Sequence, residues 1–364
     1  MTSVRASAPW MVALLLWMLA GWLRIRGMVT ATVLSDQMGP WWVAIGGPPW
    51  GEPHAPLYGW GLYWPYWLIS TLAGSLWQAI TGLLWLHALA APLAFIATWM
   101  YADSRTRWAS SIVVGAAVAL DPGSIDIALS GSKAYLCMVW VGVMTLGVLA
   151  RKRRWGPVLA WVALAMAVMN HPLAVCCLPM LFVFSWRERR VLLAVILSGM
   201  LLLPSLIWFA SHSAPTTGEL EASVVSAFRQ LWVLSPWTTG LMFAGLGLAV
   251  SHRKDRRLAV SVLLSWSLLA LLGFFLGYLR DYHLRIMLIP SLIGWARLPK
   301  YWPLLGMLFL RFPADPIDRP SQNLRPGSLG LTQLFTDRVW ESSDARIVVD
   351  RAWISASPAA EPSA

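Results

Sequence analysis

Charged side chains are scarce in this sequence. Asp, Glu, Lys and Arg make up 12% of the 364 residues, while hydrophobic residues make up 58%. A soluble domain of this size usually carries about 25% charged residues. The shortage excludes an ordinary soluble domain and indicates a chain that uses lipid as its solvent. Because apolar stretches recur along most of the chain, we expect one membrane domain rather than a soluble domain with an anchor.

Cysteines and the common catalytic motifs are also scarce or missing. The three cysteines, Cys137, Cys176 and Cys177, all lie in apolar stretches, and no pair has the spacing of metal ligands. We interpret them as packing residues. The sequence contains no N-glycosylation sequon, phosphate-binding loop, HExxH or GxSxG motif.

The charges that are present are mostly basic, giving a formal net charge of +11. Because the basic residues lie mainly in short clusters between apolar stretches, the excess follows the positive-inside rule of membrane proteins. It therefore indicates membrane topology, and we expect no nucleic acid among the partners.

The apolar stretches predict an all-α polytopic bundle of about 10–11 transmembrane helices. The first stretch lacks a small-residue cleavage site, so we interpret it as a retained helix rather than a secretory signal. The predicted spans are residues 8–26, 79–101, 107–121, 134–150, 155–170, 172–186, 190–210, 236–251, 258–279 and 284–299.

The basic clusters suggest how the chain threads through the bilayer. We start the amino terminus in the cytoplasm and treat residues 56–75, which follow a Gly- and Pro-rich stretch, as an aromatic helix on the outer surface that does not cross. If that segment crossed, the later basic clusters would be exported and Asp36 would be separated from Asp121. The clusters placed inside are Arg105/Arg107, Arg151 to Arg154, Arg187/Arg189/Arg190, Arg253 to Arg257 and Arg297/Lys300.

The same threading gathers the remaining ionisable residues at the non-cytoplasmic rim. Arg24 and Arg26 run against the rule, and we expect them to snorkel or to bind an anionic headgroup. The interiors of the predicted spans carry almost no ionisable side chains; His87 is the main exception, and we interpret it as a core residue. This lack of acids and bases inside the membrane disfavours an ion-coupled transporter. The rim residues are Asp36, Glu52, His54, Asp121, Asp126, Lys133, His171, Glu219, Arg280, Asp281, His283 and Arg285.

Asp36 lies about ten residues beyond the first predicted span, in a long outer loop at about residues 27–78. A carboxylate between a loop and the lipid can serve as a general base towards an acceptor hydroxyl. The alternative for a single Asp is a helix cap or a loop salt bridge.

Several short segments form an ordered series along the chain. They are Leu23-Arg24-Ile25, Asp36, His54-Ala55-Pro56-Leu57-Tyr58, Asp121 to Tyr135 ending Ser132-Lys133-Ala134-Tyr135, Asn170-His171-Pro172, and Leu284-Arg285-Ile286-Met287-Leu288-Ile289-Pro290. In this order they resemble the GT-C glycosyltransferases of the protein O-mannosyltransferase and lipid A aminoarabinose transferase kind, and the resemblance covers about residues 8–310. That family opens with motifs close to LRL, DE and HPPLYY, continues with an acid before Arg-x-Tyr and an outer His, and ends with an element close to RYLLP.

The resemblance implies an enzyme that moves a sugar from a polyprenyl-phosphate donor to an acceptor hydroxyl of a lipid, glycan or protein on the outer face. Asp36 corresponds to the family's catalytic carboxylate, and Asp126, or Asp121 as the less favoured choice, to its second acid. The reaction needs a base on one side of the anomeric carbon and positive charge on the other. The predicted substrate-binding residues are His54, Tyr58, Asp121, Lys133, Tyr135, His171, Arg280 and Arg285.

The sequence also departs from the family pattern. Gln37 follows Asp36 where the family often has Glu, which weakens the case for a divalent cation. We assign no metal ligands, and a bound divalent cation stays open as an alternative. Lys133, Arg280 and Arg285 have the alternative of anchoring helix ends at headgroups. For Asp121 and His171 the alternatives are structural: Asp121-Pro122 can start a turn, and His171-Pro172 can mark a helix break.

Two other functions stay open. The first is a catalytically inactive protein of the same architecture that binds a polyprenyl lipid or supports a complex. The second is a transporter or flippase of a lipid-linked glycan. We expect residues 1–312 to form the membrane domain and residues 313–364 a short polar tail. The composition suggests a bacterial inner membrane with the active face outside.

Overall fold

The structure is a computed structural model, and most of the described part is helical. The residues it describes are 2–27, 65, 68–69, 71–73, 76–129, 133–185, 193, 196–197, 199–200, 224–252, 256–276, 279, 281–297, 339–341, 345–349 and 354–358. The outer loop with Asp36, His54 and Tyr58, most of the predicted surface helix at 56–75, and almost all of the predicted span at 190–210 lie outside these residues.

The amino-terminal layer is formed by α1 (Thr2–Gly27) and α4 (Leu76–Ala88). The indole N–H of Trp17 donates to the carbonyl of Trp85 at 2.8 Å, and the two rings meet edge to face at 5.1 Å. Gly21 allows this approach, because a Cβ there would lie 2.1 Å from the Trp85 ring. The predicted span at residues 8–26 is therefore helical, and it packs against the bundle.

Two helix pairs with short connections form the centre. α5 (Ala90–Tyr101) packs along α6 (Arg107–Leu120), and α8 (Lys133–Leu149) packs along α9 (Gly156–Asn170). α8 and α9 approach closely at Gly147, where a Cβ would lie 2.6 Å from the backbone nitrogen of Ala160. Short connections make the partners of each pair antiparallel, so α6 ends, α8 begins and α9 ends at the same end of the bundle.

Further helices complete the bundle around this centre. η3 (Pro172–Cys177) and α10 (Leu178–Ser185) follow α9, and α13 (Pro236–Ser251) leads into α14 (Arg256–Leu276). Two helices were not predicted. α7 (Pro122–Leu129) links α6 to α8, and α12 (Val224–Leu234) meets α13 at a bend of 113°.

The predicted span at residues 284–299 is helical as far as Arg297, but it is not one regular α-helix. The chain there forms four short pieces, which are α15 (Asp281–Leu284), η5 (Arg285–Met287), α16 (Leu288–Leu292) and η6 (Ile293–Arg297). Pro290 lacks a backbone N–H and its ring crowds the preceding turn, which opposes a regular helix. Gly294 packs against α13 so closely that a Cβ would lie 1.7 Å from the carbonyl oxygen of Gly245.

The all-α class is confirmed for the described residues up to Arg297. By length and composition, three helical segments can cross a membrane, or four if α12 and α13 form one bent span, and the other apolar helices are shorter. The tail differs from the predicted plain polar segment. It contains β1 (Val339–Glu341), β2 (Ala345–Val349) and β3 (Ile354–Pro358), which pair antiparallel in the order β1-β2-β3.

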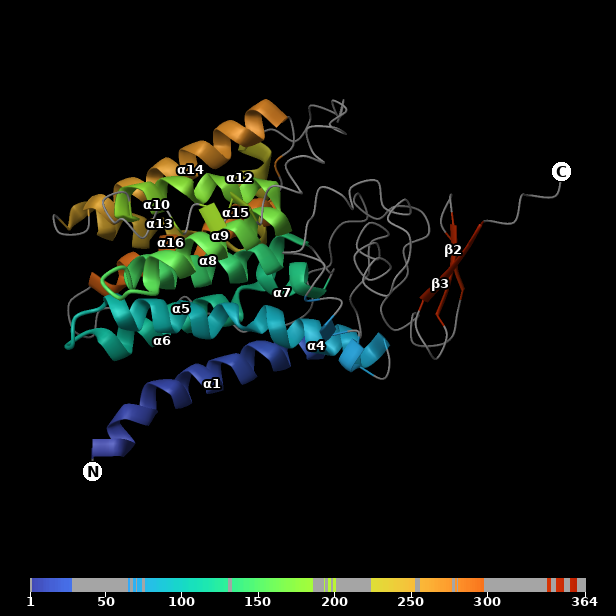
Figure 1. The fold of residues 1–364 in the computed structure, drawn as a ribbon, viewed down its shortest axis with the longest axis horizontal. Coiled ribbons are helices and arrows are strands. Elements are labelled where there is room, and N and C mark those ends of the chain that lie inside the picture. The colour runs from blue at the N-terminus through green and yellow to red at the C-terminus, as the bar shows by residue number, and fades with distance from the viewer. Residues whose placement is uncertain are drawn as a thin grey trace.

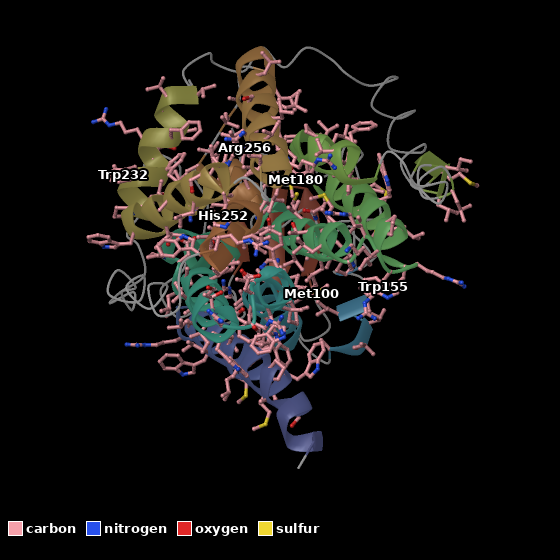
Figure 2. All side chains as sticks on the ribbon, turned by 90° about the vertical axis from the view of Figure 1, so that its left-hand side faces the viewer. Met100, Trp155, Met180, Trp232, His252 and Arg256 are labelled. Carbon is pink, nitrogen blue, oxygen red and sulfur yellow. The ribbon has the colours of Figure 1, made fainter. Side chains whose placement is uncertain are left out.

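The basic connections gather at one end of the bundle. The helices run side by side, and the α5–α6, α8–α9 and α13–α14 connections lie at the left-hand end in Figure 1. Figure 2 looks onto that end and shows Met100, Trp155, His252 and Arg256 there. Arg297 belongs to the same end, because its guanidinium lies 3.2 Å from the Asp103 carboxylate and 4.3 Å from the centre of the Tyr101 ring.

The contact at Gly147 yields a stability prediction. Gly147→Ala should lower the free energy of unfolding by about 1–3 kcal/mol, because the added methyl group meets the backbone of Ala160. The measurement is the thermal unfolding midpoint of the purified protein in detergent. The control is Gly247→Ala on α13, where a Cβ meets nothing within 4 Å and alanine is the better helix former. An unchanged midpoint for Gly147→Ala would contradict the close approach of α8 and α9.

Candidate functional site

The site begins at the end of α6, where Asp121 starts α7. Its carboxylate is fully buried and accepts hydrogen bonds from the backbone N–H of Ser124 at 2.8 Å and from the Ser124 hydroxyl. Pro122 occupies the first helical position, where a missing N–H costs nothing. The sequence Asp-Pro-Gly-Ser therefore caps the amino terminus of α7, as the turn-starter interpretation predicted.

The second component is Arg285 in η5, whose side chain is buried. Its Nη1 forms a salt bridge with Asp121 Oδ2, and its Nη2 donates to the hydroxyl of Ser235 at 3.0 Å. The same hydroxyl accepts the backbone N–H of Gly123 at 3.1 Å. A Cβ at Gly123 would lie 1.7 Å from Arg285 Nη2, so only glycine leaves room for the guanidinium. Three distant segments thus meet at one buried charge pair.

The electrostatics keep Asp121 ionised at neutral pH. Burial raises the pKa of the Asp121 carboxyl, and the charge of Arg285 lowers it. Hydrogen bonding by the hydroxyls of Ser124, Ser235 and Thr238 lowers the pKa further, and the result lies below the ordinary value of 3.8. Asp121 Oδ1 and Arg285 Nε are buried and make no hydrogen bond of normal geometry with the described residues. The Nε–H of Arg285 can therefore donate to one more acceptor.

Two histidines meet beside this pair. The rings of His171, between α9 and η3, and His283, in α15, lie 4.6 Å apart, and the ring of Tyr282 packs edge-on against His283 at 4.2 Å. Nδ1 of His171 accepts the backbone N–H of Leu173 at 3.3 Å, so a neutral His171 carries its proton on Nε2. His171 also ends α9, which confirms the predicted helix break.

Asn170 is the last residue of α9 and is fully buried. Neither its Oδ1 nor its Nδ2 has a hydrogen-bond partner among the residues that the structure describes. A buried amide without partners is unfavourable by about 1–3 kcal/mol. A water or a polar ligand group is therefore expected to complete this position.

The other predicted residues divide into two groups. Asp36, His54, Tyr58 and Arg280 lie outside the described residues. For Asp126, Lys133 and Tyr135 the backbone alone is described. Asp126 lies in α7, and Lys133 and Tyr135 lie in the first turn of α8. Since α8 begins where α6 and α9 end, these backbones share the end of the bundle that holds Asp121 and His171.

Arg24 does not snorkel as predicted. Its side chain is fully buried, and Nη1 donates to the carbonyl of Ala20 at 2.7 Å. It lies in the last turn of α1, which packs on α4, where His87 is also fully buried. Close helix packing, rather than exposure to headgroups, decides its position. Arg26, which is exposed, lies with its guanidinium 5.6 Å from the centre of the Trp22 ring.

No group of three His, Cys, Asp or Glu side chains within the described residues is arranged to hold a metal ion. The three cysteines are buried, as expected of packing residues. The sulfurs of Cys176 and Cys177 lie 3.9 Å apart, and Cys177 Sγ lies 3.9 Å from Met287 Sδ. They belong to the apolar core beneath Arg285.

Sequence reasoning missed Gly123, Ser124 and Ser235 as members of the site. Ser124 follows Asp121 at the spacing of a helix cap, which is a readable signal. Ser235 precedes Pro236 and so marks a helix start, but nothing in the local sequence links it to Arg285, 50 residues away. His283 was predicted at the rim without a role.

No protein-family model matches the chain, and no curated protein matches it. A crystal structure of ArnT from Cupriavidus metallidurans in the apo state is similar to it, with a TM-score of 0.49 and 18% sequence identity. The match covers 84% of this chain and 63% of that chain. A similarity of this extent assigns neither a family nor an activity.

The buried charge pair yields a second prediction. Asp121→Asn and Arg285→Gln should each lower the free energy of unfolding by about 3–5 kcal/mol, because each leaves a buried group without its partner. The double variant should lose less than the sum of the two losses. Thermal unfolding in detergent measures all three. Asp103→Asn, which breaks an ion pair whose carboxylate is 76% exposed, is the control and should cost no more than about 1 kcal/mol. Additive losses would show that the pair contributes nothing as a pair.

The lowered pKa of Asp121 yields a pH prediction. A carboxyl whose pKa is lower in the folded state stabilises the fold above its ordinary pKa of 3.8 and loses that contribution as the pH falls through the folded value. The difference in unfolding midpoint between the natural protein and Asp121→Asn should stay constant from about pH 6 to pH 5 and shrink below about pH 4. A difference independent of pH down to about pH 3 would contradict the lowered pKa.

Proposed function

We propose that this chain is a membrane glycosyltransferase of the GT-C type, which transfers a sugar from a polyprenyl-phosphate donor to an acceptor hydroxyl on the non-cytoplasmic face. The observation that carries the proposal is the placement of the motif segments. Asp121, the start of α8 with Lys133, and His171 lie at one end of the bundle, and Arg285 bonds to Asp121 there. The basic connections lie at the opposite end.

The proposed chemistry is a direct displacement at the sugar. The acceptor oxygen forms a bond to the anomeric carbon while the bond from that carbon to the phosphate oxygen breaks. The proton of the acceptor hydroxyl passes to a carboxylate, for which we propose Asp36. The departing polyprenyl phosphate keeps the electron pair of the broken bond, and Lys133 and Arg280 are the cations that we propose to stabilise it.

The described residues support more specific roles for two positions. The carboxylate of Asp121 is already bonded to Arg285 and Ser124, which favours Asp126 as the second acid and makes Asp121 a positioning residue for α7. The amide of Asn170 offers a donor and an acceptor beside His171, a pattern that suits a sugar hydroxyl.

A second candidate is a lipid-binding protein without transferase activity. It is favoured by the state of Arg285, whose terminal nitrogens already bond to Asp121 and Ser235 and whose charge is balanced by the carboxylate. Such a guanidinium holds the fold together and is not available to a phosphate without rearrangement. The catalytic proposal therefore depends on Asp36, Lys133 and Arg280 rather than on Arg285.

The test is Asp36→Asn in a host from which the gene has been deleted. Mass spectrometry of lipid extracts and of the cell-envelope glycans first identifies the product that the deletion removes. Asp36→Asn should then abolish this product, with a loss of at least about 100-fold as expected for a general base. The amount of protein in the membrane should stay unchanged. Asp103→Asn at the opposite end of the bundle is the matched control and should restore the product fully.

The other functions give different outcomes. Retained product in Asp36→Asn at normal membrane levels would exclude catalysis by Asp36 and support the lipid-binding candidate. Accumulation of the sugar-loaded carrier on the cytoplasmic side in the deletion strain, with attachment of outer sugar otherwise intact, would support a flippase.

A further inference from the structure

α12 carries apolar side chains on both of its faces. Ala227 and Leu231 are buried, and the helix packs on α13, α14, α15 and α7. The other face exposes Val225, Trp232 and Val233, by 75%, 55% and 68%. Arg229 is also exposed and lies one helical turn from Val225 and Trp232, so it shares their face. A face of two valines and a tryptophan around one arginine is unfavourable in water.

The length and direction of α12 exclude an ordinary span. Its 11 residues extend about 16 Å, roughly half of the hydrocarbon thickness. It meets α13 at 113°, so it runs across the direction of the bundle rather than along it. Trp237, 41% exposed, lies just beyond the bend, so an exposed indole lies on each side of it. Figure 2 shows Trp232 at the rim of the bundle. Exposed tryptophans are typical of helix segments at the membrane–water interface.

α12 also lies at the end of the bundle that holds the candidate site. Ser235, directly after α12, accepts hydrogen bonds from Arg285 and from the backbone of Gly123. The helix is therefore remote from the basic connections. Arg229 forms no ion pair with the residues that the structure describes, so an anionic lipid headgroup can neutralise its charge.

We propose that α12 lies in the headgroup–acyl boundary of the leaflet nearest the Asp121–Arg285 pair, with the bilayer itself as its partner. Val225, Trp232 and Val233 insert between the lipids, and Arg229 binds a lipid phosphate. Because Ser235 joins the end of α12 to the guanidinium of Arg285, the depth of α12 in the membrane fixes the position of one wall of the site. The proposal holds whatever reaction the site performs.

The test measures the depth of α12 in the bilayer. Single cysteines at positions 225, 229 and 233 carry nitroxide labels in the full-length protein, reconstituted into vesicles of phosphatidylcholine with phosphatidylglycerol. Collision rates with oxygen and with a water-soluble nickel chelate give the depth of each label. The native cysteines are buried, and the unsubstituted protein gives the background labelling. Position 103, with a side chain 76% exposed, is the aqueous reference, and position 264, 48% exposed within α14, is the acyl-chain reference.

We expect the labels at 225, 229 and 233 at a similar depth, about 5–10 Å below the headgroups, because the three positions share one face of α12. Replacing phosphatidylglycerol with phosphatidylcholine should make the labels at 225 and 233 shallower, because Arg229, which these two variants retain, loses its anionic partner. Three results would overturn the proposal. Chelate accessibility at all three positions equal to that at 103 would place α12 in water, and a depth equal to that at 264 would place it in the acyl chains. Protection from both reagents would mean that protein covers the face.

Discussion

The buried pair of Asp121 and Arg285 holds the candidate site together. Two charges removed from water are tolerated only when they neutralise each other and their remaining hydrogen-bonding groups are mostly satisfied. Here the pair joins residues 164 positions apart, and Ser235 adds a third segment through Arg285 and Gly123. The start of α7, the bend between α12 and α13, and the irregular segment at 281–297 must therefore be correctly placed at the same time. The apolar helices alone would not require this arrangement.

The distribution of charge over the bundle also reflects the free-energy cost of removing charged groups from water. Basic residues occupy the short connections at one end, where water and lipid headgroups solvate them without burial. At the other end, five polar side chains are buried, which is unfavourable unless structure or function requires it. They are Asp121, Asn170, His171, His283 and Arg285. This contrast is why we place the candidate site at that end of the bundle.

The two proposals place a sugar-transfer site and a membrane-contacting helix, α12, next to each other at this end of the bundle. Asp36, Lys133 and Arg280 would perform the transfer, while the Asp121–Arg285 pair positions the helices around them. A lipid-linked donor reaches such a site from the bilayer, so a helix at the headgroup–acyl boundary next to Ser235 lies where the donor would enter. A protein that binds the lipid without transferring a sugar would use the same arrangement, and Asp36 distinguishes the two.

The sequence by itself determined the membrane class and the bounds of α6, α8, α9 and α13 to within one residue, because apolar runs with basic, Gly or Pro boundaries are local signals. For α1 it determined the end but not the start, which lies six residues before the predicted span. It also indicated Asp121, His171 and Arg285 as rim residues. Only the tertiary structure decided that Asp121 and Arg285 neutralise each other, that Ser235 and Gly123 complete the pair, and that Arg24 is buried. The change between α-helical and 3-10 turns over 281–297 and the bend at Ser235 likewise depend on packing against distant helices. Contacts between segments more than 100 residues apart leave no periodic pattern in the sequence, so the partners of Asp121 and Arg285 could be identified only in the folded chain.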